Sequence, residues 1–286
     1  MQLYTTIKNL QKVLSEKRSA GNSIGFVPTM GALHQGHLEL VKRSVLENDA
    51  TVVSIFVNPT QFNNANDLLK YPRTLEVDCD LLQTVACTCV FAPEVKEIYP
   101  EPDTRSFIFG DLVTGMEGRF RPGHFNGVAQ VVSRLFDIVK PDKAYFGEKD
   151  FQQLAVVREL VRQLDLNIQI IACPIVREKD GLAMSSRNRR LNENQRKQAA
   201  IIAKTLFEST EKKNNFSVPE LKQWVINQIN AASELQVEYF EIVDGITLHP
   251  IEKWKDTNNS VGCIAVFAGE VRLIDNVTYP EVSGNK

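Results

Sequence analysis

The chain has 286 residues, a formal net charge of −2 at pH 7, 43% hydrophobic residues and 24% charged residues. This composition is typical of a globular protein with a sizeable core, in one large domain or two modest ones. The near-neutral charge excludes the strongly basic class of nucleic-acid-binding proteins and gives no general attraction to anionic membranes. An anionic ligand therefore has to be bound by a local cluster of basic groups.

No stretch reaches the roughly 18 apolar residues of a membrane-spanning helix, and the N-terminal segment has no apolar core of signal-peptide length. The five cysteines show no CxxC or Cys/His metal-binding spacing. An odd number of cysteines without a secretion signal favours reduced thiols. We therefore expect a cytoplasmic protein that binds neither membrane nor nucleic acid.

The first half of the chain alternates between two kinds of pattern. Apolar runs predict strands at residues 24–28, 52–57, 88–91, 143–146 and 168–173. Helical periodicity predicts helices at residues 37–47, 75–85, 128–139 and 150–164. This alternation predicts an α/β fold with a Rossmann-like, doubly wound parallel sheet. Ligands then bind at the carboxyl ends of the strands.

The pattern changes after about residue 176. Two helical patterns are followed by three short strand patterns, at residues 192–210, 217–232, 236–243, 261–267 and 271–274. This order predicts a smaller α+β domain. We therefore expect two domains, residues 1–176 and 177–286, the second of which closes over the active site.

The run Pro28-Thr-Met-Gly-Ala-Leu-His-Gln-Gly-His37 follows a predicted strand and enters an amphipathic helix. A helix start supplies backbone N–H groups and a dipole that attract phosphate. His34 and His37 are three residues apart, so both rings face the same way and can donate hydrogen bonds to phosphate oxygens. Two incidental histidines, or half of a metal site, are the alternative interpretations. No third metal ligand lies nearby, and we favour phosphate.

Two amide side chains, Asn58 and Gln61, follow the next predicted strand. They are suited to hydroxyl and carboxylate groups, although Asn-Pro is equally typical of a turn and Gln61 can equally satisfy backbone groups. In the run 147–153, Lys149 is a point charge for a phosphate. Asp150 can cap a helix, hold a ribose hydroxyl or bind a metal. Gln153 lies one turn further on and can face the same cleft as Gln61.

Two further segments have the composition of anion-binding loops. Ser185, Ser186 and Arg187 offer two hydroxyls and a guanidinium, which suit a triphosphate; an exposed surface loop is the alternative. The segment 115–127 has four glycines and several basic residues, which is typical of a mobile loop over an anionic substrate but equally of simple flexibility.

Six motifs together resemble one family: PTMGALHQGH, FVNPTQF, YPRT, GRFRPGHFNGV, GEKDFQQ and MSSRN. They stand in the order and approximate spacing of the pantoate–β-alanine ligase (pantothenate synthetase) family, which the chain resembles over nearly its whole length. HQGH also resembles the HxGH signature of the wider nucleotidylyltransferase superfamily. MSSRN stands where class I aminoacyl-tRNA synthetases carry their KMSKS-type loop.

The resemblance implies a two-step reaction. The carboxylate of pantoate attacks the α-phosphorus of Mg·ATP, which gives pantoyl adenylate and pyrophosphate. The amine of β-alanine then attacks the adenylate and gives pantothenate and AMP. The resemblance also implies a cytoplasmic homodimer, with ATP as a substrate and Mg²⁺ as the metal.

The resemblance assigns roles by position. His37 is implied to be catalytic, supported by His34 and Lys149. The residues implied to contact ATP are Met30, Gly31, Ala32, Leu33, His34, Gln35, Gly36, His37, Gly147, Glu148, Lys149, Asp150, Val176, Met184, Ser185, Ser186 and Arg187. Those implied to contact the acid are Gln61 and Gln153, with Gln61 also near the β-alanine position, and we place Asn58 beside them. Acidic residues after YPRT are associated with the metal; Asp78 is the best match, and Glu76 and Asp80 compete.

Two other functions stay open. A nucleotidylyltransferase would release a stable nucleotide adduct without the amine step, and a regulatory module would bind ATP without turnover. A tRNA synthetase would need an anticodon-binding domain, for which the chain has no room. Two glutamines at the acid site would leave the carboxylate more nucleophilic than an arginine would, and this is our hypothesis.

Overall fold

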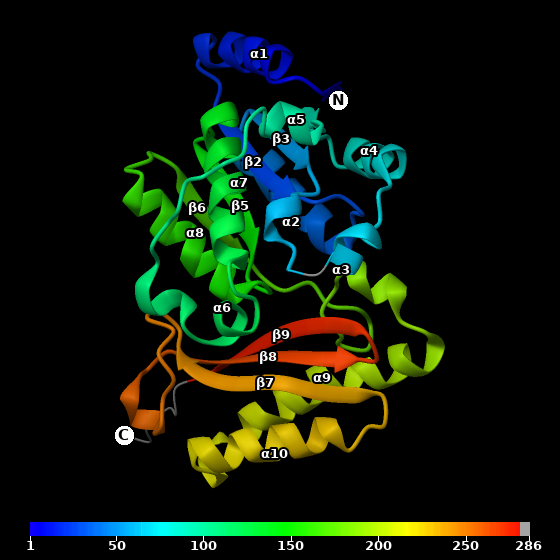
Figure 1. Cartoon of the computed structure of the whole chain (residues 1–286), viewed down its shortest axis with the longest axis vertical. Coiled ribbons are helices and arrows are strands. Elements are labelled where there is room, and N and C mark those ends of the chain that lie inside the picture. The colour runs from blue at the N-terminus through cyan, green and yellow to red at the C-terminus, as the bar shows by residue number, and fades with distance from the viewer. Residues whose placement is uncertain (64, 281–286) are drawn as a thin grey trace. The chain divides into compact units, whose positions relative to one another are not determined.

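The structure is a computed structural model that describes residues 1–63 and 65–280. The chain folds into two compact units, whose elements are labelled in Figure 1. Unit 1 consists of Met1–Phe109, Phe120–Glu148 and Gln153–Pro174. Unit 2 consists of Gly110–Arg119, Lys149–Gln152 and the chain from Ile175 onward. The boundary at residue 176 and the closing motion remain predictions.

Unit 1 contains a six-stranded parallel sheet in the order β1-β4-β3-β2-β5-β6. The strands are β1 (Gln2–Tyr4), β2 (Ile24–Thr29), β3 (Ala50–Ile55), β4 (Cys89–Phe91), β5 (Lys143–Gly147) and β6 (Gln169–Cys173). The chain moves outward from β2 in one direction and from β5 in the other, so the topological switch point lies between these two strands. The predicted doubly wound α/β fold is confirmed.

Helices cover both faces of this sheet. The helices of this part of the chain are α1 (Ile7–Ser19), α2 (Gln35–Glu47), α3 (Ala65–Leu69), α4 (Leu75–Thr84), α5 (Val95–Ile98), α7 (His124–Val139) and α8 (Phe151–Gln163). Neighbouring strand residues point to opposite faces. Val27 accordingly packs in the cluster formed with α2 and α4, whereas Phe26 lies edge-on to Phe136 of α7, with ring centroids 6.3 Å apart.

Unit 2 contains the three-stranded antiparallel sheet β7 (Leu235–Asp244), β8 (Ser260–Ala268) and β9 (Val271–Tyr279). Helices α9 (Glu193–Lys212) and α10 (Val218–Asn230) pack against it and share one apolar core. Asn192 and Ser217 start these helices with capping boxes. The predicted α+β character is confirmed. Short helical segments complete the unit: η2 (Gly110–Val113), α6 (Met116–Phe120), η3 (Ser186–Arg190), η4 (Lys213–Asn215) and η5 (Trp254–Asp256).

Several elements differ from the sequence prediction. Strand β1 and helix α1 were not predicted, although Leu10 and Leu14 of α1 are fully buried. The segment 115–127 is not one continuous loop, because it forms α6 and the start of α7. Gly123, in the left-handed conformation with φ 81°, begins α7 at His124 rather than at residue 128. In α6, Glu117 is paired with Arg272 at 2.7 Å.

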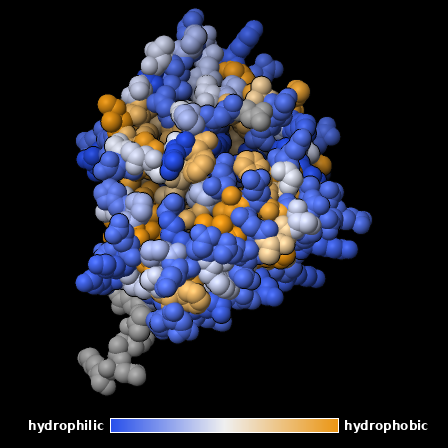
Figure 2. All heavy atoms as spheres, turned by 60° about the horizontal axis from the view of Figure 1, so that its bottom comes forward, coloured by the Kyte–Doolittle hydropathy of each residue, from blue (hydrophilic) through white to orange (hydrophobic). Residues whose placement is uncertain are grey.

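The surface is mainly polar on the face that Figure 2 shows, with apolar side chains gathered in smaller patches near its middle. Within the part of the chain that the structure describes, no helix is long and apolar enough to cross a membrane.

Candidate active site

Three of the predicted motifs follow three neighbouring strands of unit 1. Strand β2 pairs in parallel with β3 on one side and β5 on the other. The histidine motif follows β2, Asn58 and Gln61 follow β3, and Glu148 follows β5. The carboxyl ends of parallel strands meet at one edge, so these motifs come together beside the switch point, where doubly wound sheets bind their ligands.

The turn between β2 and α2 requires two consecutive left-handed residues. Gly31 has φ 80° and Ala32 has φ 51°. A Cβ on Gly31 would lie 2.9 Å from the Ile55 side chain and 3.0 Å from Asp78 Oδ2, so glycine is needed for space as well as for conformation.

Asp78 of α4 anchors this turn. Its Oδ2 accepts the backbone N–H of Ala32 at 2.9 Å, and its Oδ1 accepts that of Leu33 at 2.8 Å. The hydroxyl of Thr74 donates to the same Oδ1 at 3.2 Å. The Asp78 side chain is buried, with a residue exposure of 1%. The carboxylate therefore satisfies two successive backbone N–H donors of this turn.

His34 and His37 lie beside each other, with ring centroids 4.0 Å apart. The N–H of Gly36 donates to His34 Nδ1 at 3.1 Å, and the N–H of His34 donates to His37 Nδ1 at 3.3 Å. Since both Nδ1 atoms accept hydrogen bonds, both neutral rings carry their proton on Nε2. The capping arrangement at the start of α2 therefore gives both rings an Nε2–H donor.

Residues 30–37 differ in what they expose. Gly31, Ala32, Leu33 and Gly36 are buried and shape the turn, whereas the other four are at least partly exposed. The exposed Gln35 donates from its amide to Glu39 at 2.6 Å, along the helix surface.

The two amides after β3 are directly linked. Asn58 Nδ2 donates to Gln61 Oε1 at 3.2 Å, and Gln61 Nε2 donates to Met30 Sδ at 3.1 Å. Asn58 is buried, with an exposure of 1%, whereas Gln61 is partly exposed. Asn58 therefore acts on Gln61, which is the side chain able to meet a ligand. Gln153, at the start of α8, is also partly exposed.

A cavity of about 370 Å³ opens at the same edge of unit 1. It is lined by the turn at Met30 and Gly31, by the end of β3, by Arg73 to Leu75 with Asp78, and by residues 92–95 after β4. The motif YPRT was identified only as a family motif, and the position of its Arg73 and Thr74 in the lining of this cavity was not predicted. The sequence did contain a signal for this, because the cation Arg73 stands next to Thr74, the residue at the start of α4.

Of the remaining predicted nucleotide residues, Gly147 ends β5 in unit 1, and those from Lys149 onward belong to unit 2. Lys149 Nζ lies 3.9 Å from Asp150 Oδ2, and the Lys149 side chain is 20% exposed. Asn276 of β9 donates from Nδ2 to the backbone carbonyl of Lys149 at 3.1 Å. This hydrogen bond fixes the backbone of the short 149–152 segment to the sheet of unit 2.

The segment that contains Val176 and Met184–Arg187 is a structured part of unit 2. The N–H of Met184 donates to the Val176 carbonyl at 3.0 Å. Arg177 makes two hydrogen bonds to the buried carboxylate of Asp275, at 2.7 and 2.9 Å. Ser185 Oγ accepts the N–H of Arg187 at 3.3 Å and so caps η3, while Ser186 is buried.

A magnesium site made by protein side chains alone does not fit these residues. Among the described residues, no group of three or more His, Cys, Asp or Glu side chains could hold a metal. Both oxygens of Asp78 already accept backbone N–H groups. The assignment of Asp78 to a metal stays a prediction, and we derive no step through a protein-bound ion.

Comparison with known proteins agrees with this fold. The family model described as pantoate–β-alanine ligase matches residues 2–278. Pantothenate synthetase of Phocaeicola vulgatus is 61% identical over 98% of this chain and 99% of its own length. The crystal structure of pantothenate synthetase from Thermus thermophilus is 43% identical, with a TM-score of 0.92 over 98% of this chain and all of that one.

A third comparison concerns ligands. The pantoate–β-alanine ligase of Francisella tularensis was crystallised with βγ ATP and β-alanine; it is 35% identical, with a TM-score of 0.83 and 98% of each chain covered. These matches show that the protein is a ligase with a doubly wound sheet. The chain belongs to the pantoate–β-alanine ligase family, and the resemblance seen in the sequence is confirmed.

Proposed function

We propose that this chain condenses (R)-pantoate with β-alanine through a pantoyl adenylate, with release of pyrophosphate and then AMP. The observation that carries the proposal is the pair of His34 and His37, whose Nδ1 atoms are both occupied by backbone N–H groups. Each Nε2–H is then a fixed donor for the negative charge that develops on ATP when its α-phosphorus is attacked.

The residues divide between the two substrates. His34 and His37, with Lys149 and Arg187, are proposed to bind the phosphates of ATP, and Gln61 and Gln153 the acid. A carboxylate nucleophile arrives already deprotonated, so the first step needs no general base. His37 is therefore proposed to stabilise charge and not to transfer a proton in that step.

Magnesium is proposed to enter as part of the Mg·ATP substrate. Mg²⁺ commonly keeps several waters and is held through nucleotide phosphates with few protein ligands. This agrees with the absence of a group of metal ligands among the residues described. The chemistry proposed for the chain's own side chains is hydrogen bonding and charge neutralisation at the phosphates.

A cytoplasmic homodimer whose second domain closes over the site is proposed on the family resemblance. The free state of all five cysteines supports a reducing compartment. Light scattering after gel filtration tests the dimer directly, because a mass near that of one chain would exclude it.

The products of the reaction test the proposed function. The protein is incubated with Mg·ATP and pantoate, with and without β-alanine. We expect pyrophosphate to depend on pantoate, and pantothenate and AMP to require β-alanine as well. Formation of ADP would contradict the adenylate. A stable adduct that β-alanine does not consume would favour a nucleotidylyltransferase, and ATP binding without turnover would favour a regulatory module.

A further inference from the structure

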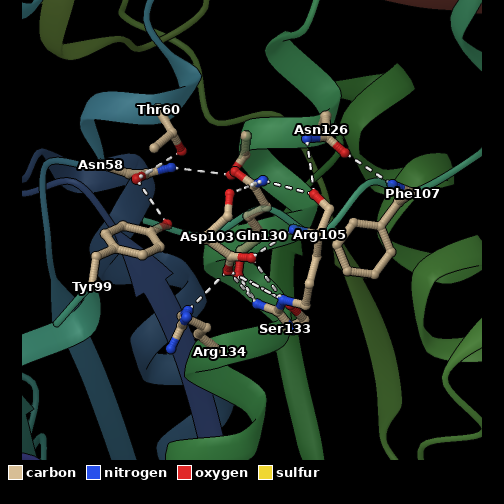
Figure 3. A network of polar contacts seen from close by, with 11 residues as sticks. Asn58, Thr60, Tyr99, Asp103, Arg105, Phe107, Asn126, Gln130, Ser133 and Arg134 are labelled. Atoms are coloured by element: carbon tan, nitrogen blue, oxygen red, sulfur yellow. Dashed lines mark hydrogen bonds and ion pairs between the residues drawn. The ribbon is translucent and has the colours of Figure 1, made fainter. Parts of the chain in front are cut away.

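A polar network in unit 1 includes Asn58 and Tyr99 (Figure 3), and a hydrogen bond from Asn58 continues it to the side chain of Gln61. A glutamine amide has one acceptor end and one donor end, so its orientation decides which chemical group it can bind. Gln61 Oε1 accepts from Asn58, and its Nε2 is directed to Met30 at the start of the histidine turn. The residues that orient Asn58 therefore determine which end of the Gln61 amide is directed to a substrate.

The orientation of the Asn58 amide is fixed by a backbone carbonyl, which can accept a hydrogen bond but cannot donate one. Its Nδ2 donates to the backbone carbonyl of Gly127 at 3.1 Å, which places Oδ1 on the opposite side. There Oδ1 accepts the hydroxyls of Tyr99, at 3.1 Å, and Thr60, at 3.2 Å. A Cβ on Gly127 would lie 2.4 Å from the Thr60 carbonyl oxygen, so glycine allows this close approach of α7.

Tyr99 is held in place from two sides. The guanidinium carbon of Arg134 lies 5.3 Å from the centre of its ring, and the ring of Phe56 lies 6.2 Å away. Arg134 is itself bound to Asp103, with Nε 2.9 Å from Oδ2, as Figure 3 shows. Burial raises the pKa of Tyr99 above its ordinary value. Its hydroxyl therefore keeps its proton at neutral pH and acts as a donor to Asn58.

We propose that Tyr99 is a positioning residue, which through Asn58 holds the Gln61 amide with its N–H₂ group toward the acid substrate. An N–H₂ group binds carboxylate and hydroxyl oxygens, which accept hydrogen bonds. Gln61 Oε1 already accepts a hydrogen bond from Asn58, which holds this end of the amide toward Asn58. The inference rests on the proposed function, in which Gln61 binds the pantoate.

The test is the variant Tyr99→Phe, which removes one hydroxyl and keeps the ring on Arg134. We expect the KM for pantoate to rise about 3- to 10-fold, the range of one hydrogen bond, while the KM values for ATP and β-alanine stay within about twofold. Thr60→Val removes the other donor to the same Asn58 oxygen, so it should shift the pantoate KM in the same direction. The double variant should have a higher KM for pantoate than either single variant.

Tyr145→Phe is the matched control. Its hydroxyl is hydrogen-bonded to Asn48 and Glu47 within the same unit but has no link to Gln61. We expect it to lower stability without selective loss of pantoate affinity. An equal rise of all three KM values in Tyr99→Phe, or an unchanged pantoate KM, would overturn the proposal.

Calorimetric titration of pantoate into the folded Tyr99→Phe protein tests the positioning role of Tyr99 separately from the proposed function, because binding needs no turnover. Weaker pantoate binding than in the wild type supports the positioning role. Equal binding overturns it while the proposed function stands. Absence of pantoate-dependent pyrophosphate release by the wild-type protein would instead defeat the proposed function itself.

Discussion

Asp78 and Leu33 are 45 residues apart in the sequence, yet Asp78 Oδ1 accepts the Leu33 N–H at 2.8 Å in the buried turn before α2. The companion bond from Ala32 uses the other carboxylate oxygen. The histidines follow directly after this turn. The positions of their donors therefore depend on a carboxylate that does not itself need to touch the substrate.

Asp78→Asn is expected to disturb the turn. Asparagine has one acceptor oxygen, so its N–H₂ group would face a backbone N–H. We expect a loss of about 2 kcal/mol in the free energy of unfolding, the scale of hydrogen bonds to a charged group, and slower adenylation. The half-saturating Mg²⁺ concentration should stay unchanged in a steady-state titration. A strongly raised Mg²⁺ requirement with unchanged stability would show that Asp78 is a metal ligand.

His34→Asn separates the two functions of this histidine. An asparagine oxygen can still accept the Gly36 N–H at the helix start, but the Nε2–H donor is lost. We expect a near-native melting temperature together with adenylation slowed about 10²-fold. His34→Ala loses the cap as well and should cost about 1 kcal/mol of stability. If His34→Asn adenylates at the wild-type rate, the Nε2–H group has no role in catalysis.

Lys149→Ala is expected to slow adenylation about 10²- to 10³-fold, because a positive charge at the phosphates is lost. Lys149→Arg keeps the charge on a differently shaped group and should recover part of the rate. Single-turnover pyrophosphate release measures the chemical step, and circular dichroism verifies the fold. Unfolding of Lys149→Ala would show that the side chain has a structural role. The backbone of Lys149 already has such a role, because its carbonyl accepts a hydrogen bond from Asn276.

The network behind Tyr99 predicts a pH dependence of stability. The hydrogen bond from Arg105, supported by Arg134, holds the pKa of Asp103 well below its ordinary value, and the Asp103 side chain is only 2% exposed. A depressed pKa stabilises the fold above the unfolded-state pKa of about 4. This contribution is lost as the pH falls from there through the folded-state pKa.

Urea unfolding at pH values between about 7 and 3 tests this linkage in wild type and Asp103→Asn. The variant should be less stable at pH 7, and the difference should narrow as the pH falls below about 4. A difference that stays constant over this range would show that the Asp103 carboxylate is not linked to acid unfolding.

The sequence predicted the strands that position the site, because short apolar runs such as residues 24–28 are bounded by turn residues and are too short for buried helices. The sequence also predicted that the histidines lie at a helix start, because a helix start is indicated by residues that are neighbours in the sequence. It did not predict β1, which has three residues, or α1, whose apolar positions are few. Both elements are stabilised by packing against distant parts of the chain.

The roles of single polar residues were harder to predict from the sequence than the strands and helices. Asn58 was predicted to lie beside the acid, and this stays a prediction; that its buried amide donates to the carbonyl of Gly127, far along the chain, could not be predicted from the sequence. Tyr99 had no local pattern at all, because its partner lies 41 residues away. Interactions of this kind depend on tertiary packing, and a single sequence carries no periodic signal for them.

The central claim is that the pantoate carboxylate attacks the α-phosphorus of ATP, and oxygen transfer tests it most directly. Pantoate labelled with ¹⁸O in its carboxylate is converted with Mg·ATP and β-alanine, and the nucleotide product is analysed by mass spectrometry. The adenylate route predicts AMP that carries one ¹⁸O in its phosphate. Unlabelled AMP, or label in inorganic phosphate together with ADP, would contradict it.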